Sequence, residues 1–136
     1  MQTIQEGKAG LVRNQKGMTL IELLAVVIVL GIIMAIAVPS VAGVIERSKL
    51  QADKGTWYII KEAGLRYALA NNLDQSTTVD VTTLVNEGYL NEAPQPQHSD
   101  IKTRGFEQVE ITVSGSKYTI EVLDKDGTAF DESDFE

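Results

Sequence analysis

A single apolar run near the beginning of the chain constrains its fold more than any other feature. Residues 23–45 contain no charged side chain, and Glu22 is the only charge between Lys16 and Glu46. A run of this length can cross a bilayer as one helix, because a spanning helix needs about 20 apolar residues. A carboxylate at the start of such a helix is costly in lipid, so Glu22 is a candidate functional residue.

The polar leader before this run predicts how the helix enters a membrane. Residues 1–17 carry Lys8, Arg13 and Lys16 against one acid, Glu6. Positive charge ahead of a span favours an N-in, C-out orientation. A secretory signal peptide would have a shorter apolar core followed by a small-residue cleavage site, and this sequence shows neither. The leader and the run together predict a membrane anchor that crosses the bilayer once.

The residues around Gly17 carry a more specific signal. From Gly17 to Leu24 the chain reads Gly-Met-Thr-Leu-Ile-Glu-Leu-Leu, which resembles the class III signal of type IV pilins and pseudopilins. The resemblance implies that a prepilin peptidase cuts between Gly17 and Met18 and methylates the new amine of Met18. Methionine departs from phenylalanine, the most common first residue of the mature family members. In this family the apolar segment stays on the mature protein.

Glu22 has two interpretations, and the motif around it favours the first. A Met18 amine and a carboxylate four residues later share one helix face, and each charge favours a partner in a dry environment. Glu22 is therefore expected to pair with the Met18 amine of a neighbouring subunit and to set the register of a fibre, which is also the role that the family gives this position. The second interpretation is that Glu22 only stabilises the positive end of its own helix.

The helix is expected to continue to about Asn72. Its later half carries two stripes at helical spacing, which suggests two different partners. The first stripe would pack on the chain's own sheet and the second would contact neighbouring subunits, although packing of both in one core is an alternative. The first consists of Leu50, Trp57, Ile60, Gly64 and Tyr67, and the second of Tyr58, Leu65 and Leu69.

Gly31 and Pro39 interrupt the apolar half of the expected helix. Proline removes an intrahelical hydrogen bond and glycine weakens a helix. Both positions match residues of the pilin family, where the segment between them is often stretched in filaments. We expect a continuous or gently kinked helix in the free subunit and local melting of residues 32–38 in a fibre, whereas an ordinary kinked membrane helix is the alternative.

The rest of the chain is expected to form a small α+β head, giving a pilin fold in which a long N-terminal helix packs on an antiparallel sheet. Residues 79–90 resemble the short helix and "GYL" segment of pseudopilins and Gram-positive pilins, with Thr82 or Asp80 as the cap and Gly88 as the end. Strands are predicted at 106–113 and 118–123, joined by a hairpin turn at 114–116, with a third strand at 128–130. The expected divisions are a leader (1–17), an assembly helix (18–45), its amphipathic continuation (46–72) and a head with an acidic C-terminal tail (73–136).

No arrangement of residues predicts an enzyme. The only histidine, His98, lies in a Pro- and Gln-rich segment and is expected at the surface. The chain has no cysteine, and its net charge of −7 argues against nucleic-acid binding by the lone subunit. Asp124 and Asp126 are candidate oxygen ligands for Ca²⁺, but a solvated acidic tail fits the last thirteen residues better, and no cofactor is expected.

The resemblance implies a structural function. We expect a subunit, major rather than minor, of a type IV pilus or pseudopilus, made as a precursor in the bacterial cell membrane and then found in an extracellular or cell-surface filament. Its implied partners are copies of itself, the prepilin peptidase, an inner-membrane assembly platform, minor pilins and the membrane, with DNA bound only by a filament. The alternatives are a competence or type II secretion pseudopilin and, less favoured, a monomeric membrane-anchored binding module. Gram-positive competence pilins are similar in size.

Overall fold

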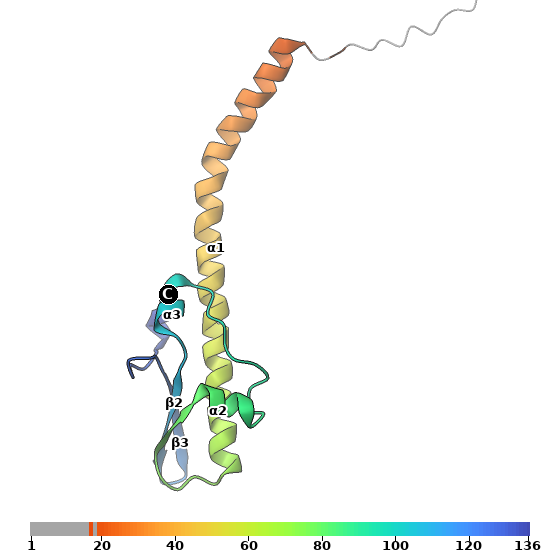
Figure 1. Ribbon diagram of the computed structural model, residues 1–136. Coiled ribbons are helices and arrows are strands. Elements are labelled where there is room, and N and C mark those ends of the chain that lie inside the picture. Colours follow the sequence, from red (N-terminus) through yellow and green to blue (C-terminus); the bar gives the residue numbers. More distant parts are fainter. Residues whose placement is uncertain (1–16, 18) are drawn as a thin grey trace, which may run out of the picture. The chain divides into compact units, whose positions relative to one another are not determined.

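The computed structural model describes residue 17 and residues 19–136 (Figure 1). The chain divides after Pro39 into two compact units, the second of which is Ser40–Glu136. The long helix α1 contributes its first part to one unit and its remainder to the other. The elements in order are α1 (Leu20–Ala70), β1 (Thr77–Asp80), α2 (Val81–Asn86), α3 (Ser99–Arg104), β2 (Gln108–Ser114), β3 (Lys117–Leu123) and the 3₁₀ helix η1 (Glu132–Phe135).

The described part of the first unit is almost entirely helix. Glu22 lies in the first turn of α1, and the apolar residues that follow it are all exposed. α1 is long and apolar enough to cross a membrane, judged by length and composition. The expected apolar helix is therefore present, and Gly31 and Pro39 both lie inside it.

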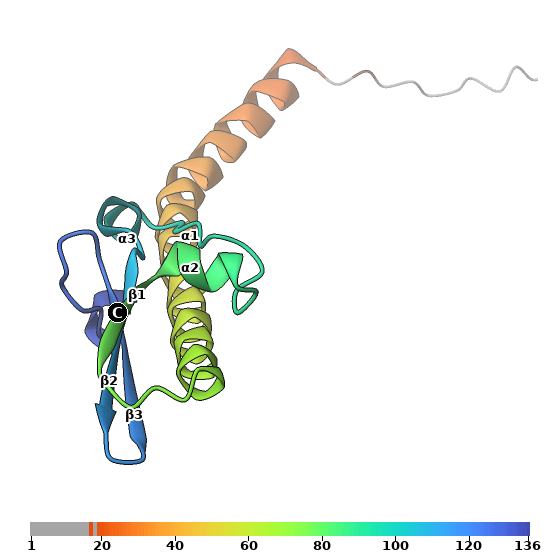
Figure 2. The ribbon, with the colours of Figure 1, turned by 60° about the horizontal axis from the view of Figure 1, so that its bottom comes forward.

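The second unit contains the α+β head that the sequence predicts. Its sheet has the order β1-β2-β3, and both neighbouring pairs are antiparallel (Figure 2). Ser114 pairs with Lys117 across a two-residue turn, in which Gly115 has a φ of 61°. Such turns require positive φ values that glycine adopts without strain. Instead of a third strand at 128–130, only Ala129 forms a bridge, to Leu123.

The core lies between the sheet and one side of α1. The strand residues that alternate toward α1 are buried, as period-2 alternation predicts. Helix residues at spacings of three and four complete the core. The buried set comprises Trp57, Ile60, Ala63, Ala68, Val79, Val81, Leu84, Leu90, Ile101, Phe106, Val109, Ile111, Ile120, Val122, Phe130 and Phe135.

α1 ends at Ala70, slightly before the expected boundary, in a well-defined cap. Asn72 has a φ of 47°, and its N–H donates to the Leu69 carbonyl at 3.3 Å. The Leu73 N–H donates to the Ala68 carbonyl at 3.1 Å. These two bonds form a Schellman motif, in which asparagine replaces the usual glycine in the left-handed position. The cap turns the chain back toward the sheet.

Three elements of the head were not predicted: β1, α3 and the 3₁₀ helix η1. β1 has only four residues and three of them are polar, so its pattern is too short to separate from a loop. It forms by pairing with β2. Helix α3 is also short, and its N-cap is His98, whose side chain accepts from the Asp100 N–H at 3.4 Å. The short helix α2 was predicted, but the Asp80 side chain does not cap it and instead accepts from Gln108 Nε2 at 3.0 Å.

Candidate functional site

The start of α1 is closed by a reciprocal pair of hydrogen bonds. Glu22 Oε2 accepts from the Thr19 N–H at 3.2 Å, and Thr19 Oγ1 accepts from the Glu22 N–H at 3.3 Å. This is a capping box, which satisfies two of the unpaired N–H groups at a helix start. The second interpretation of Glu22, stabilisation of its own helix end, therefore has a structural basis. Met18, the expected partner in a neighbouring subunit, lies outside the described residues.

The expected processing site is open around Gly17. Gly17 is exposed, and a Cβ placed on it would meet no atom within 4 Å. Cleavage between Gly17 and Met18 stays a prediction, because the structure describes only the first of these residues. The same openness surrounds Gly31, further along the helix.

The first half of α1 presents an apolar surface that no other described part of the chain covers. Every residue from Leu20 to Ile45 is exposed, including Leu20 at 88% and Ile36 at 71%. Soluble monomers rarely expose contiguous apolar patches of this extent. This surface therefore requires lipid or other protein chains around it.

The two stripes on the later half of α1 face different surroundings. Trp57, Ile60 and Gly64 of the first stripe are buried against the head, and Leu50 and Tyr67 pack at the edge of the core. In the second stripe, Tyr58, Leu65 and Leu69 are 49%, 37% and 57% exposed. The prediction that only one stripe packs on the chain's own sheet is confirmed, and the side chains of the second stripe stay partly exposed.

The acidic C-terminal segment is folded onto the head, so it is not a free tail, although most of its acidic side chains are solvated as expected. Asp124 is only 4% exposed and accepts from Arg104 Nε at 2.9 Å. Arg104 Nη1 also donates to Asp134 at 2.6 Å, and its guanidinium lies 3.9 Å from the centre of the Phe130 ring. One arginine thus joins two acids and an aromatic ring. The sequence alone gave no sign of this pairing, because Arg104 precedes its partners by a whole hairpin.

The oxygens of Asp124 are fully engaged. Asp124 Oδ1 accepts from the N–H groups of Asp126 and Thr128, both at 2.9 Å, while Oδ2 binds Arg104. Burial alone would raise the pKa of Asp124, but these hydrogen bonds outweigh it and place the pKa below its ordinary value. Within residues 17 and 19–136, no group of three or more acidic, His or Cys side chains is arranged to hold a metal.

A second set of contacts joins the C-terminal segment to α1. Glu132 accepts from Lys54 Nζ at 2.9 Å and from the Tyr58 hydroxyl at 3.2 Å. The hydrogen bond from Lys54 is the main reason that the pKa of Glu132 is lowered. Beside it, Phe135 is buried with its ring centre 5.3 Å from that of Trp57. The segment is therefore fixed by both ion pairs and apolar packing.

The loop before α3 is fastened to α1 by a buried acid. Asp53 is 1% exposed, and its two carboxylate oxygens accept from the N–H groups of Gln97 and His98, each at 2.8 Å. The His98 side chain is half-buried and its Nε2 lies 3.6 Å from a Glu46 oxygen, so the expectation of a surface histidine is wrong. The sequence analysis missed Asp53, because an acid on the apolar face of a helix has no visible partner until the loop folds over it.

Comparison with known proteins identifies a family motif at the start of α1. Residues 12–38 match the family model described as the prokaryotic N-terminal methylation motif. The type II secretion system core protein G of Pseudomonas aeruginosa is 37% identical over 86 residues, which cover 63% of this chain and 59% of that protein. The protein of the same name from Aeromonas hydrophila is 32% identical over 85 residues, covering 62% and 58%.

The chain thus spans less than two thirds of the length of these curated relatives. No solved structure matches it. The relatives nevertheless extend the similarity well beyond the residues of the motif. Together, the methylation motif, the apolar helix that follows it and the matches to two core proteins of type II secretion make this chain similar to the type IV pilins and pseudopilins.

Proposed function

We propose that the chain is a structural subunit of a pilus or pseudopilus filament, most closely of the major type. The observation that supports this most directly is the exposed apolar half of α1, with Glu22 as its only charge. A helix of this kind can lie first in the membrane of the precursor and then among the helices of neighbouring subunits. The change from lipid to protein surroundings keeps the same surface covered.

The proposed assembly starts with removal of the leader. A prepilin peptidase cuts after Gly17, which leaves the methylated amine of Met18 as a new positive charge. Glu22 of one subunit then pairs with the Met18 amine of its neighbour. Because an unpaired charge in a dry environment is strongly unfavourable, this pair penalises wrong alignments of the subunits.

The later half of α1 supports a subunit rather than a plain anchor. A monomeric anchored domain has no need for a second exposed apolar stripe outside the membrane span. Here Tyr58, Leu65 and Leu69 leave such a stripe uncovered by the head. We propose that it lies against other subunits. Between Gly31 and Pro39, where α1 is helical in the structure, we propose that the helix melts locally in the filament.

The decisive test combines Glu22→Ala with an assay for sheared filaments. The variant is expected to be processed normally, so mass spectrometry should find a chain that starts at methylated Met18, but filaments should be lost. Glu46→Ala is the matched control, because Glu46 is the next acid along the helix and lies beyond the apolar run. Normal filaments from Glu22→Ala would refute the pairing. A wild-type chain that is found only in membranes, with no sheared filament, would support the anchored binding module instead.

The relatives favour one machine for this filament. Both are named as core proteins of type II secretion, so we propose a secretion pseudopilus ahead of a competence or motility pilus. An assembly platform and minor pseudopilins in the inner membrane would then be its partners. Deletion of the gene should abolish the export of secreted proteins and leave transformation and twitching intact. Loss of transformation with normal secretion would instead identify a competence pilus.

A further inference from the structure

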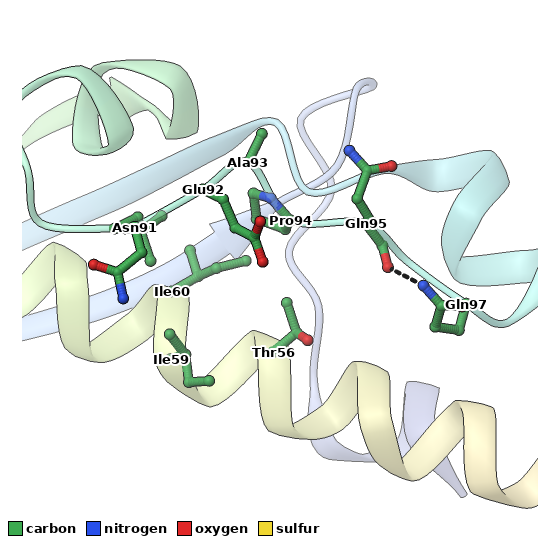
Figure 3. Close-up of a pocket in the computed structure, with 10 residues that line it drawn as sticks. Thr56, Ile59, Ile60, Asn91, Glu92, Ala93, Pro94, Gln95 and Gln97 are labelled. Carbon is green, nitrogen blue, oxygen red and sulfur yellow. Dashed lines mark hydrogen bonds between the residues drawn. The ribbon is translucent and has the colours of Figure 1, made fainter.

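The head carries an acidic pocket between α1 and the loop that follows α2 (Figure 3). Its volume is about 370 Å³, and its lining includes Thr56, Ile59, Asn91, Glu92 and Gln95. Glu92 is the only charged residue of this lining, and Figure 3 shows its side chain directed into the space between the loop and the helix. Among the described residues, no cation lies within ion-pair distance of Glu92. We call this the loop pocket.

A basic groove lies between α1 and β3. It measures about 580 Å³, and its lining includes the hydrophobic residues Tyr58, Leu65 and Ile120 and the two lysines Lys61 and Lys117. The remaining charge in its lining, Glu62, already forms an ion pair with Arg66. Lys117 is exposed, and in the part of the chain that the structure describes it forms no ion pair. We call this the edge groove.

The edge groove also borders an unpaired strand edge. β3 is the last strand of the sheet, with β2 on one side only. On its other side, the described residues supply only the bridge from Ala129 to Leu123 and the hydrogen bond from the Phe130 N–H to the Val122 carbonyl. The first part of β3, beside the groove, therefore keeps free backbone donors and acceptors. Unpaired strand edges of this kind readily accept another chain.

The loop pocket and the edge groove lie on opposite flanks of the buried stripe of α1. Successive helix positions are rotated by about 100°, which places Thr56 and Ile59 on one side of Trp57 and Ile60, and Tyr58 and Leu65 on the other. Figure 2 shows the same arrangement, with the loop after α2 on one side of α1 and the strands on the other. Because the two surfaces lie on different flanks of the same helix, they cannot meet within one head.

The two surfaces are complementary. Each combines an exposed hydrophobic residue of α1, Ile59 in the pocket and Tyr58 in the groove, with charged side chains. The pocket has one acid, Glu92, and the groove has two lysines beside an acid, Glu62, that is already paired with Arg66. A contact between different surfaces of identical subunits is heterologous, and it propagates into a helical filament when its rotation does not close a ring. Rim charges of opposite sign steer such contacts and select the partner.

We propose that the loop pocket of one head receives the edge-groove side of a second copy, with Glu92 of one subunit paired with Lys117 of the next. This contact rests on the proposed filament function and adds to it a head-to-head surface outside the membrane helix. Lys61 is only partly exposed, and its Nζ lies over the Trp57 ring, 4.5 Å from the ring centre. Lys117 follows the hairpin turn at Gly115 and is the more accessible cation.

The chain contains no cysteine, which allows a direct test by cross-linking. A chain that carries both Glu92→Cys and Lys117→Cys is expressed in the producing cell, and its sheared filaments are oxidised. Since each subunit supplies both halves of the contact, a ladder of covalent multimers is expected on a non-reducing gel. The matched control pairs Glu92→Cys with Glu121→Cys, which lies toward the other end of β3 and should give monomer. Filaments without a ladder would overturn the docking contact alone.

Charge reversal gives an independent readout. Lys117→Glu and Glu92→Lys should each reduce the yield of sheared filament several-fold, and the two together should restore it. Lys125→Glu, an exposed reversal outside the groove, should leave the yield unchanged. Failure of the double variant to recover would count against the pair, provided that its melting temperature matches that of the wild type. Absence of filaments from the unmodified chain would overturn the proposed function, and the docking contact with it.

Discussion

Gly64→Ala tests how closely α1 approaches the sheet. A Cβ at Gly64 would lie 2.8 Å from Val109 Cγ1 and 2.9 Å from Ile120 Cγ2, which is closer than packed carbons approach. Both neighbours are buried, β-branched side chains with little rotamer freedom. Alanine gains about 1 kcal/mol over glycine in a helix, but overpacking of a core costs about 1–3 kcal/mol. The variant should therefore lose up to about 2 kcal/mol of unfolding free energy.

Gly55→Ala provides the matched control in the same helix. Gly55 is exposed, and a Cβ there would meet nothing within 4 Å, so only the helix preference applies. This variant should gain about 1 kcal/mol, which places the two variants about 1–3 kcal/mol apart.

The assay uses the only tryptophan of the chain. Trp57 is 5% exposed and packs beside Phe135, so its fluorescence reports on unfolding of the head. Guanidinium titration of the full chain in detergent gives the midpoint and slope for the wild type and both variants. If Gly64→Ala gains as much stability as Gly55→Ala, the close packing of α1 on Val109 and Ile120 is wrong.

Three further predictions concern the C-terminal segment. Arg104→Met leaves Asp124 buried without its cation and should lower the unfolding free energy by about 2–3 kcal/mol. This loss is smaller than for a fully buried ion pair, because Arg104 is partly exposed. The control, Lys102→Met at an exposed position of the same helix, should change the unfolding free energy little. The pKa values of Asp124, Asp131 and Glu132 are lowered in the folded head, so their stabilisation is complete only above their ordinary pKa values, from about pH 5 upward. It is lost as the pH falls through the lowered values, and unfolding followed by Trp57 fluorescence at a series of pH values will measure this loss. Added Ca²⁺ should leave the melting temperature unchanged, because Arg104 and two backbone N–H groups already bind the oxygens of Asp124. A clear rise of the melting temperature with Ca²⁺ would contradict this.

The features that the sequence predicts correctly all depend on local periodicity. The first stripe of α1 and the alternation in β2 and β3 each reveal a buried face within a few residues. The hairpin turn at 114–116 and the short helix α2 have equally local signals. These patterns are sufficient for the α+β fold, because each element shows on its own which side must be covered.

The features that the sequence misses depend on partners far along the chain. Asp53 is compensated by two N–H groups more than forty residues away. Asp124 looked like part of a solvated tail, yet it is buried because Arg104 comes to it from α3. β1 exists through its pairing with β2 rather than through its own pattern. In each case a polar group satisfies a distant one, and polar residues carry no periodicity that reveals such a pairing.

The capping box connects the two interpretations of Glu22 rather than choosing between them. In the structure, the carboxylate accepts from the Thr19 N–H and so has a partner at the end of its own helix. A cap of this kind contributes about 1 kcal/mol, whereas a charge left unpaired in a dry environment is strongly unfavourable, so the carboxylate favours an amine partner once both charges are present. In the proposed assembly, removal of the leader would create that second charge at Met18. The same Glu22 oxygen could then accept from the Thr19 N–H before cleavage and pair with the Met18 amine of a neighbouring subunit after it.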